Sequence, residues 1–179
     1  MNIVIQSEGT SAYGLIKFLK EKTNPIGLEI GVYNGINATN LLNSVPNLTL
    51  HGVDPYSVFT DWNGRLTHHE EDPDSAEKVA DKLLTPFKSR FTKIKKTSDE
   101  ALTMFEDNSF DFIFIDGLHT YEQVLIDCKN YYPKLKTGGI FSGHDYNTIQ
   151  GVKEAVNEFA TTVNKTILIE QNDVWYYVK

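Results

Sequence analysis

Residues 27 to 35 read Gly27-Leu28-Glu29-Ile30-Gly31-Val32-Tyr33-Asn34-Gly35, and this stretch decides the fold. Its apolar start predicts a buried strand, its glycines predict a tight turn, and a helical pattern begins directly after it. A second apolar strand, residues 48–53, then ends on Asp54. Glycines let a ligand approach the backbone, the helix N-terminus offers free N–H groups, and an acid after the next strand can accept hydrogen bonds from ribose hydroxyls. The stretch therefore predicts a nucleoside-binding strand–turn–helix unit.

The glycine pattern departs from the dinucleotide fingerprint G-x-G-x-x-G, because this chain has Glu-x-Gly-x-x-x-Gly. A turn with two glycines behind a glutamate suits a pyrophosphate less well than a ligand with a positively charged centre. The pattern resembles the first motif of class I S-adenosylmethionine (SAM) methyltransferases. The resemblance implies that the turn holds the methionine part of SAM and that the acid holds the ribose. The cofactor contacts expected in this unit are Glu29, Gly31, Tyr33, Asn34, Gly35 and Asp54.

The composition describes one acidic domain. The chain has 179 residues, 40% of them hydrophobic, and a formal net charge of −7. This length supports one complete core, so residues 1–179 are expected to form a single domain. The negative charge argues against binding to nucleic acid or to an anionic membrane, since either would need a basic face. A single cysteine, Cys128, excludes an internal disulfide, and together with the absence of a signal-peptide pattern it favours a cytoplasmic protein.

Short apolar strands alternate with amphipathic helices along most of the chain. After the strand that follows Pro25, strands are expected at 48–53, 91–96, 110–116, 140–143, 165–170 and 174–178. Helices are expected at 11–22, 36–45, 73–88, 120–135 and 151–160, with a short one capped by Ser98. The last two strands pair as a hairpin around residues 171–173, as in class I methyltransferases. The expected fold is a Rossmann-like, doubly wound α/β sheet of seven strands, mostly parallel, with an antiparallel C-terminal hairpin strand.

Residues 55–72 fit neither a strand nor a helix. Aromatic and basic side chains are scattered through this segment at Tyr56, Phe59, Trp62, Arg65, His68 and His69. A long irregular loop inside a compact domain is usually functional. The segment is expected to be a substrate or lid loop, and the alternative is a fixed packing loop at a dimer contact.

Parallel strands place their C-terminal ends on one rim, where α/β proteins bind ligands. Polar residues follow each of the other central strands, and the cofactor is expected to contact some of them, with Thr97 or Ser98 beside the adenine. The residues expected on the rim in addition to the first turn are Thr97, Ser98, Asp116, His119, His144 and Asp145, of which Thr97, Ser98 and Asp116 are expected to contact SAM.

Two motifs in the second half of the chain are more specific than the glycine turn. They read Asp116-Gly117-Leu118-His119-Thr120-Tyr121 and Gly143-His144-Asp145-Tyr146. They resemble a subset of class I methyltransferases, the methyltransferase 24 type, which includes the macrolide-sugar O-methyltransferases and the cephalosporin-hydroxylase-like enzymes. The resemblance covers residues 26–160 and implies methyl transfer to a hydroxyl oxygen of a small molecule, such as a sugar, a phenol or a natural product.

Catechol and caffeoyl-CoA O-methyltransferases share the same plan more distantly, and in them acids after strands four and five hold Mg²⁺. Asp116 and Asp145 stand at the corresponding places, so the resemblance implies Mg²⁺ between them, with His144 as a further candidate ligand. A divalent ion held by oxygen ligands lowers the pKa of a bound hydroxyl. Tyr146 stands where those relatives carry Asn, and His144 where others carry an acid, so metal dependence stays open.

His119 and His144 are candidates for the general base, because imidazole titrates near neutrality. The alternative is that His119 orients Asp116 or caps the next helix and that His144 supports the site. The expected catalytic set is Asp116, His119, His144 and Asp145, and the expected partner is a small-molecule methyl acceptor, with a homodimer left open. A SAM-binding or nucleotide-binding module without methyl transfer is the alternative function. The missing third glycine and the antiparallel end disfavour an NAD-dependent oxidoreductase.

Overall fold

The computed structural model describes residues 15–57, 60 and 73–179. Most of the expected lid loop, from Phe59 through Trp62 and Arg65 to His69, lies outside the described residues, as does the expected start of the first helix at Ser11. In the described ranges the strands are β1 (Ile26–Ile30), β2 (Thr49–Val53), β3 (Phe91–Ile94), β4 (Phe110–Ile115), β5 (Leu135–Gly143), β6 (Leu168–Glu170) and β7 (Val174–Val178). The helices are α1 (Ile16–Lys20), α2 (Ile36–Ser44), α3 (Pro73–Leu84), α4 (Ser98–Ala101), α5 (Tyr121–Tyr131) and α6 (Gln150–Thr162).

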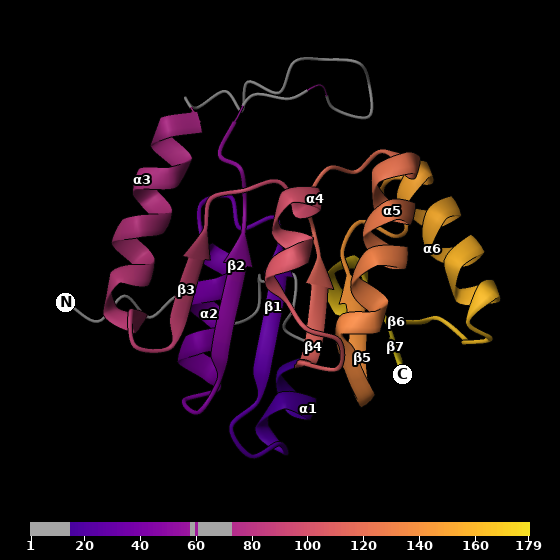
Figure 1. Ribbon diagram of the computed structural model, residues 1–179, viewed down its shortest axis with the longest axis horizontal. Helices are drawn as coiled ribbons and strands as arrows, with labels where there is room; N and C mark the ends of the chain where they lie inside the picture. The colour runs from indigo at the N-terminus through magenta and orange to yellow at the C-terminus, as the bar shows by residue number, and fades with distance from the viewer. Residues whose placement is uncertain (1–14, 58–59, 61–72) are drawn as a thin grey trace.

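These strands form one sheet in the order β3-β2-β1-β4-β5-β7-β6 (Figure 1). The strands from β3 to β5 run parallel, and β7 runs antiparallel to both β5 and β6. The fold predicted from the sequence, a mostly parallel seven-stranded sheet with an antiparallel C-terminal hairpin, is therefore confirmed.

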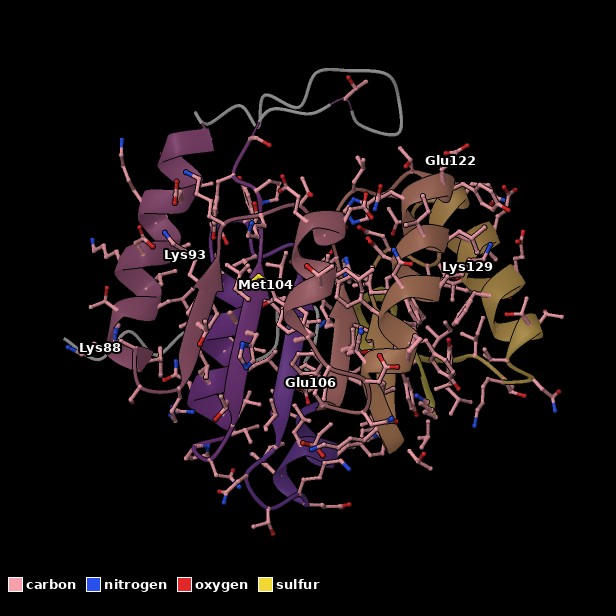
Figure 2. The ribbon with its side chains drawn as sticks, viewed as in Figure 1. Lys88, Lys93, Met104, Glu106, Glu122 and Lys129 are labelled. Atoms are coloured by element: carbon pink, nitrogen blue, oxygen red, sulfur yellow. The ribbon has the colours of Figure 1, made fainter. Side chains whose placement is uncertain are left out.

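Both faces of the sheet are covered by helices (Figure 1), and β4 shows how. Phe112 and Phe114 pack into the core that also contains side chains of α1, α2 and α3, whereas Ile113 and Ile115 pack into the core under α4, α5 and α6. A strand that is apolar on both faces has to lie in the middle of such a sandwich. At the outer edge lies Lys93 on β3 (labelled in Figure 2). It binds Glu77 and Asp81 on α3 through ion pairs of 2.9 and 2.6 Å.

Several element boundaries differ from those predicted, and specific contacts explain two of the differences. Thr97, not Ser98, caps α4. The Thr97 hydroxyl accepts a hydrogen bond from the Glu100 N–H at 3.2 Å, and the Glu100 carboxylate accepts one from the Thr97 N–H at 3.0 Å. This is a capping box, which fixes the cap by a reciprocal pair of bonds.

The second of these concerns β5, which begins at Leu135 and contains Gly138 and Gly139, whereas the sequence predicts a helix to residue 135 and a strand only from residue 140. The strand extends this far because Leu135 pairs with Phe110 on β4 and because Lys179 pairs with Gly138 and Gly139. The Gly138 N–H donates to the Lys179 carbonyl at 3.3 Å, and the Lys179 N–H donates to the Gly139 carbonyl at 2.9 Å. The predicted helices 73–88 and 120–135 end in 3₁₀ turns, Thr85–Phe87 and Tyr132–Lys134, each of which contains a proline.

The direction of winding changes between β1 and β4. The chain passes from β1 outward to β2 and β3, and later from β4 outward to β5 on the other side. A crevice forms beyond the C-terminal ends of the strands at such a switch point, and ligands bind there in open α/β sheets. The fold thus points to the β1 and β4 ends as the site. Among the described residues, no helix has the length and apolar character needed to cross a membrane.

Candidate active site

The turn between β1 and α2 depends on left-handed backbone conformations. Gly31, Tyr33 and Gly35 have φ angles of 90°, 50° and 77°. The Gly31 N–H donates to the Val53 carbonyl at 2.8 Å, which joins the turn to the end of β2. A Cβ atom on Gly31 would lie 2.0 Å from the carbonyl oxygen of Asp116, so only glycine fits there. The turn is therefore in backbone contact with the end of β4.

Asp54 fastens this turn from the end of β2. Its Oδ2 atom accepts hydrogen bonds from the N–H groups of Val32 at 3.0 Å and Tyr33 at 2.8 Å, and its Oδ1 atom accepts one from the Tyr56 N–H at 2.8 Å. A carboxylate has about four acceptor positions. The backbone uses two on Oδ2 and one on Oδ1, which leaves one position on Oδ1 for a ligand hydroxyl. Asn34, also in the turn, accepts a hydrogen bond from the Ile36 N–H.

Glu29 is a buried acid with an unused oxygen. Only 1% of the surface of Glu29 is exposed. Its Oε1 atom accepts a hydrogen bond from the Asn37 amide at 2.8 Å. Its Oε2 atom is buried and has no hydrogen-bond partner within the described residues. Burial raises the pKa of Glu29, the hydrogen bond from Asn37 lowers it, and the charges of Asp116 and Asp54 raise it. Together these effects give a pKa of about 8. Such an orphaned oxygen calls for a donor from a ligand or a water.

Ser98 opens α4 at the end of β3, and its hydroxyl is engaged inside the protein. The Gln123 amide donates to the Ser98 hydroxyl at 3.2 Å and to the Asp127 carboxylate at 3.1 Å, and the Tyr131 hydroxyl donates to the Ser98 carbonyl. Burial raises the pKa of Asp127 to about 6, although bonds from Ser98 and Gln123 lower it. We did not single out Gln123 and Asp127 in the sequence. The only signal for them in the sequence is their spacing, because residues four apart lie on the same face of a helix and this face of α5 packs against the sheet.

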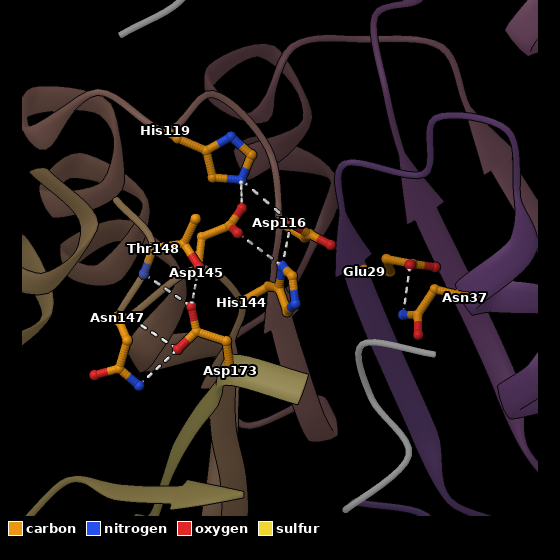
Figure 3. A network of polar contacts seen from close by, with 9 residues as sticks. All are labelled: Glu29, Asn37, Asp116, His119, His144, Asp145, Asn147, Thr148 and Asp173. Carbon is orange, nitrogen blue, oxygen red and sulfur yellow. Dashed lines mark hydrogen bonds and ion pairs between the residues drawn. The ribbon is translucent and has the colours of Figure 1, made fainter. Parts of the chain in front are cut away.

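The four predicted catalytic residues come together at the ends of β4 and β5 (Figure 3). The Nε2 atom of His119 lies 3.2 Å from Asp116 Oδ1 and 3.0 Å from Asp145 Oδ2. The Nδ1 atom of His144 lies 3.2 Å from Asp145 Oδ1 and 3.8 Å from Asp116 Oδ1. Ligand atoms of Asp116, His144 and Asp145 all lie within 4.8 Å of one another. We call Asp116, His119, His144 and Asp145 together the rim cluster. It adjoins the glycine turn through Asp116.

Opposite charges balance in the rim cluster. Burial lowers the pKa of His119, but its hydrogen bonds with Asp116 and Asp145 raise it by more, to about 9. Burial also lowers the pKa of His144, and the bond with Asp145 reverses that effect. Burial raises the pKa of Asp145, but the two histidines hold it well below its ordinary value. At neutral pH the cluster therefore holds the ionised Asp145 carboxylate against the imidazolium of His119.

The segment after Asp145 is held by a residue that the sequence analysis placed only in a turn. Asp173, between β6 and β7, accepts hydrogen bonds from the backbone N–H groups of Asn147 and Thr148 and from both of their side chains (Figure 3). Asp145 itself has a left-handed backbone with φ of 61°. No periodic pattern in the sequence indicated the contact between these two turns.

A pocket of about 490 Å³ opens beside His119. It is lined by residues 119–122 and 148–151, which are the N-terminal ends of α5 and α6 with the segments before them. Gly151 allows the two ends to approach, because a Cβ atom there would lie 3.1 Å from the Tyr121 nitrogen. The pocket offers hydroxyl, amide and carboxylate groups next to the rim cluster.

The comparisons with known proteins place the chain in a family. The family model of a methyltransferase domain, of the methyltransferase 24 type, matches residues 28–146, which is well over half of the chain. The O-methyltransferase NovP has a similar structure, with a TM-score of 0.69 and 16% identity, over 92% of this chain and 78% of that one. A protein from Staphylococcus aureus assigned by name to the caffeoyl-CoA O-methyltransferases has a TM-score of 0.67 and 14% identity, over 92% and 80%.

A protein from Clostridium thermocellum named as an rRNA methylase has a TM-score of 0.64 and 18% identity, over 93% of both chains. At these identities the solved structures establish the fold alone. Among curated proteins, the uncharacterized protein y4gI of Sinorhizobium fredii (strain NBRC 101917 / NGR234) is 40% identical over 57 residues. That match covers 31% of this chain and 6% of the relative, so it spans only a small part of the relative's length.

Proposed function

The chain belongs to the SAM-dependent methyltransferases of this family, and we propose that it transfers the methyl group to a hydroxyl oxygen of a small molecule with the help of a divalent cation. One observation carries the proposal: Asp116, His144 and Asp145 converge within 4.8 Å at the switch point of the sheet, directly beside the glycine turn. A methyl donor in the turn and an acceptor at these residues would therefore be neighbours.

The residues of the turn fit SAM in three respects. The orphaned Oε2 atom of Glu29 suits the ammonium group of the methionine part, and Asp54 keeps one acceptor position on Oδ1 for a ribose hydroxyl. Gly31 admits the ligand to the backbone because it carries no side chain. SAM supplies a methyl group activated by its positive sulfonium. The glutamate and the aspartate would hold these two parts of the cofactor.

Asp116 and Asp145 would hold the cation with carboxylate oxygens, and His144 would add an imidazole nitrogen. A divalent cation at this place supplies positive charge that lowers the pKa of an acceptor hydroxyl. His119 borders the pocket, and its Nε2 atom is protonated between the two carboxylates in the free protein. A cation held by these carboxylates would lower the pKa of His119, and the neutral imidazole could then take the acceptor proton. The pocket at residues 119–122 and 148–151 would take the acceptor, and its hydroxyl and amide groups match a hydroxylated molecule.

A radiolabelled methyl-transfer assay tests this function. Purified protein, SAM and a panel of hydroxylated sugars and phenols are incubated with EDTA or with Mg²⁺ or Mn²⁺. We expect methyl transfer only when the cation is present. We expect Asp145→Asn to lower the rate of transfer by several orders of magnitude, while the affinity for SAM stays nearly unchanged. Asparagine tolerates the left-handed backbone of Asp145, so the variant should fold. Asp107→Asn, at an exposed acid paired with Lys134, is the matched control.

Each other outcome selects a different function. Full activity in EDTA would remove the cation from the mechanism and make His119 or His144 the general base. SAM binding without transfer to any acceptor would favour a binding module, and full activity in both Asp116→Asn and Asp145→Asn would move the reaction away from the rim cluster. A thermal-shift comparison of SAM with NAD identifies an oxidoreductase if NAD alone stabilises the protein.

A further inference from the structure

We propose that Asp173 is a positioning residue, which sets the places of Asp145 and His144 by fastening the segment after β5 to the turn between β6 and β7. Asp173 lies on a different element from the rim cluster, and its carboxylate is directed at residues 147–148 rather than at the cluster (Figure 3). The inference rests on the proposed function wherever its test measures activity or metal binding.

The contacts of Asp173 form a complete clamp on two successive residues. Its Oδ1 atom accepts hydrogen bonds from the backbone nitrogen and the side-chain amide of Asn147, at 2.7 and 2.8 Å. Its Oδ2 atom accepts bonds from the backbone nitrogen and the hydroxyl of Thr148, at 2.9 and 2.6 Å. Hydrogen bonds to a charged acceptor are stronger than neutral ones. One carboxylate thus uses all of its acceptor positions on this segment.

The clamped segment begins at the rim cluster. Asp145 has the left-handed φ of 61°, and its carbonyl accepts a hydrogen bond from the Ile149 N–H at 3.0 Å, which closes the turn over residues 147–148. Aspartate tolerates this backbone conformation better than most residues do, so no intrinsic strain fixes it there. Asp173 holds the two N–H groups inside that turn. Release of the clamp would therefore let Asp145 rotate away from His119 and His144.

A second contact joins the same turn to the cluster. The imidazole of His144 makes a hydrogen bond with the backbone of Asn172, the residue before Asp173. Gly143, the residue before His144, is paired with Trp175 in the β5–β7 ladder. The turn after β5 and the turn before β7 therefore leave the sheet side by side. The C-terminal hairpin therefore supports both candidate ligands that follow β5, His144 through Asn172 and Asp145 through Asp173.

The test compares Asp173→Ala and Asp173→Asn with Gln171→Ala, a change at an exposed residue of the same turn. Asparagine keeps the shape of the side chain and tolerates the left-handed φ of 62°, but it replaces one acceptor oxygen by a donor. We expect Asp173→Ala to weaken Mn²⁺ binding and to lower kcat at least tenfold, while the Kd for SAM changes less than twofold. Asp173→Asn should show a smaller loss, and Gln171→Ala should behave as wild type.

A spectroscopic readout separates this inference from the proposed function. The imidazole ¹H–¹⁵N signals of His119 and His144 should shift in Asp173→Ala and stay in place in Gln171→Ala, and this measurement needs neither turnover nor metal. Unmoved imidazole signals and unchanged Mn²⁺ affinity in a folded Asp173→Ala protein would overturn the positioning role. If the wild-type protein transfers no methyl group, the proposed function fails. The imidazole signals then still show whether Asp173 positions His144 and Asp145. If Asp173→Ala does not unfold cooperatively, Asp173→Asn decides alone.

Discussion

Gly31 and Asp116 are in backbone contact at the centre of the sheet. A Cβ atom on Gly31 would lie 2.0 Å from the Asp116 carbonyl oxygen and 2.8 Å from the Gly117 Cα atom. The Asp116 N–H in turn donates to the Ile30 carbonyl, the residue before Gly31, at 2.8 Å. The glycine turn and the rim cluster are thus joined through their backbones, so a change on either side reaches the other.

Gly31→Ala should therefore disturb both stability and cofactor binding. A left-handed backbone at a non-glycine residue costs about 1–3 kcal/mol, and the clash with Asp116 adds to it because a backbone carbonyl cannot move aside. Each kcal/mol lowers Tm by about 2–4 °C in a chain of this size. Gly138→Ala is the control, since Gly138 has a φ of 76° and no atom within 4 Å of its Cβ position. Calorimetry should find SAM affinity lost only in Gly31→Ala; equal Tm and affinity in the two variants would contradict the contact.

Asp54→Ala should destabilise the protein as well as weaken SAM binding. The change removes the acceptor for three backbone N–H groups, on Val32, Tyr33 and Tyr56, and it removes the remaining position for a ribose hydroxyl. We expect SAM binding to lose about 1–3 kcal/mol through unpaired polar groups. Titration calorimetry measures the affinity, and urea unfolding measures the stability, with Asp107→Ala as the control. Wild-type affinity in Asp54→Ala would refute the assignment of Asp54 to the ribose.

The positions of the site residues that could be predicted from the sequence depend on local patterns and on one rule of topology. The glycine turn is readable because its special backbone conformations select glycine within a short stretch. Asp116, His119, His144 and Asp145 were placed together because parallel strands end on the same rim. The cap of α4 was misplaced by one residue, although Thr97-x-x-Glu100 carries the capping-box signal that Ser98 lacks.

The contacts that prediction missed are long-range and aperiodic. Asp173 lies 25 residues from Thr148, and nothing in either turn indicates the other. The early start of β5 depends on the pairing of Leu135 with Phe110 and on the pairing of Gly138 and Gly139 with Lys179. The unused oxygen of Glu29 and the bonds that fill three positions of Asp54 also follow only from packing. Such details depend on which side chains meet in three dimensions, and hydrophobic period and turn chemistry do not encode them.

Asp127→Asn should remove part of the pH dependence of stability. Burial raises the folded-state pKa of Asp127 to about 6, from an ordinary value of 3.8. A raised carboxyl pKa means that the folded state holds the proton more tightly, so this group makes stability fall as pH rises from about 4 to 6. The whole effect is on the order of 3 kcal/mol. Urea unfolding at pH 4 and pH 7 measures how the free energy of unfolding changes with pH. From pH 4 to pH 7 this free energy should fall further, or rise less, in wild type and in Asp107→Asn than in Asp127→Asn. An identical difference in all three proteins would contradict the buried titration.

SAM binding should release a proton from Glu29. With a pKa of about 8, this buried carboxyl is mostly protonated at pH 7 in the free protein. An ammonium group beside the orphaned Oε2 atom favours the carboxylate, so the proton leaves when SAM binds. Linkage then requires that the measured binding enthalpy depend on the buffer. In phosphate and in Tris at pH 7, calorimetry should indicate release of nearly one proton per SAM, and the release should decrease as the pH rises and Glu29 becomes ionised in the free protein.

Glu29→Gln provides the matched control for this measurement. Glutamine keeps the shape of the side chain and the acceptor for Asn37, but it cannot ionise, so any remaining proton exchange belongs to the ligand or to other groups. The variant should bind SAM more weakly, because the ammonium group would face a neutral amide, and its binding enthalpy should be nearly the same in both buffers at pH 7. A buffer dependence as large as that of wild type would show that the proton comes from elsewhere and would remove Glu29 as the partner of the ammonium group.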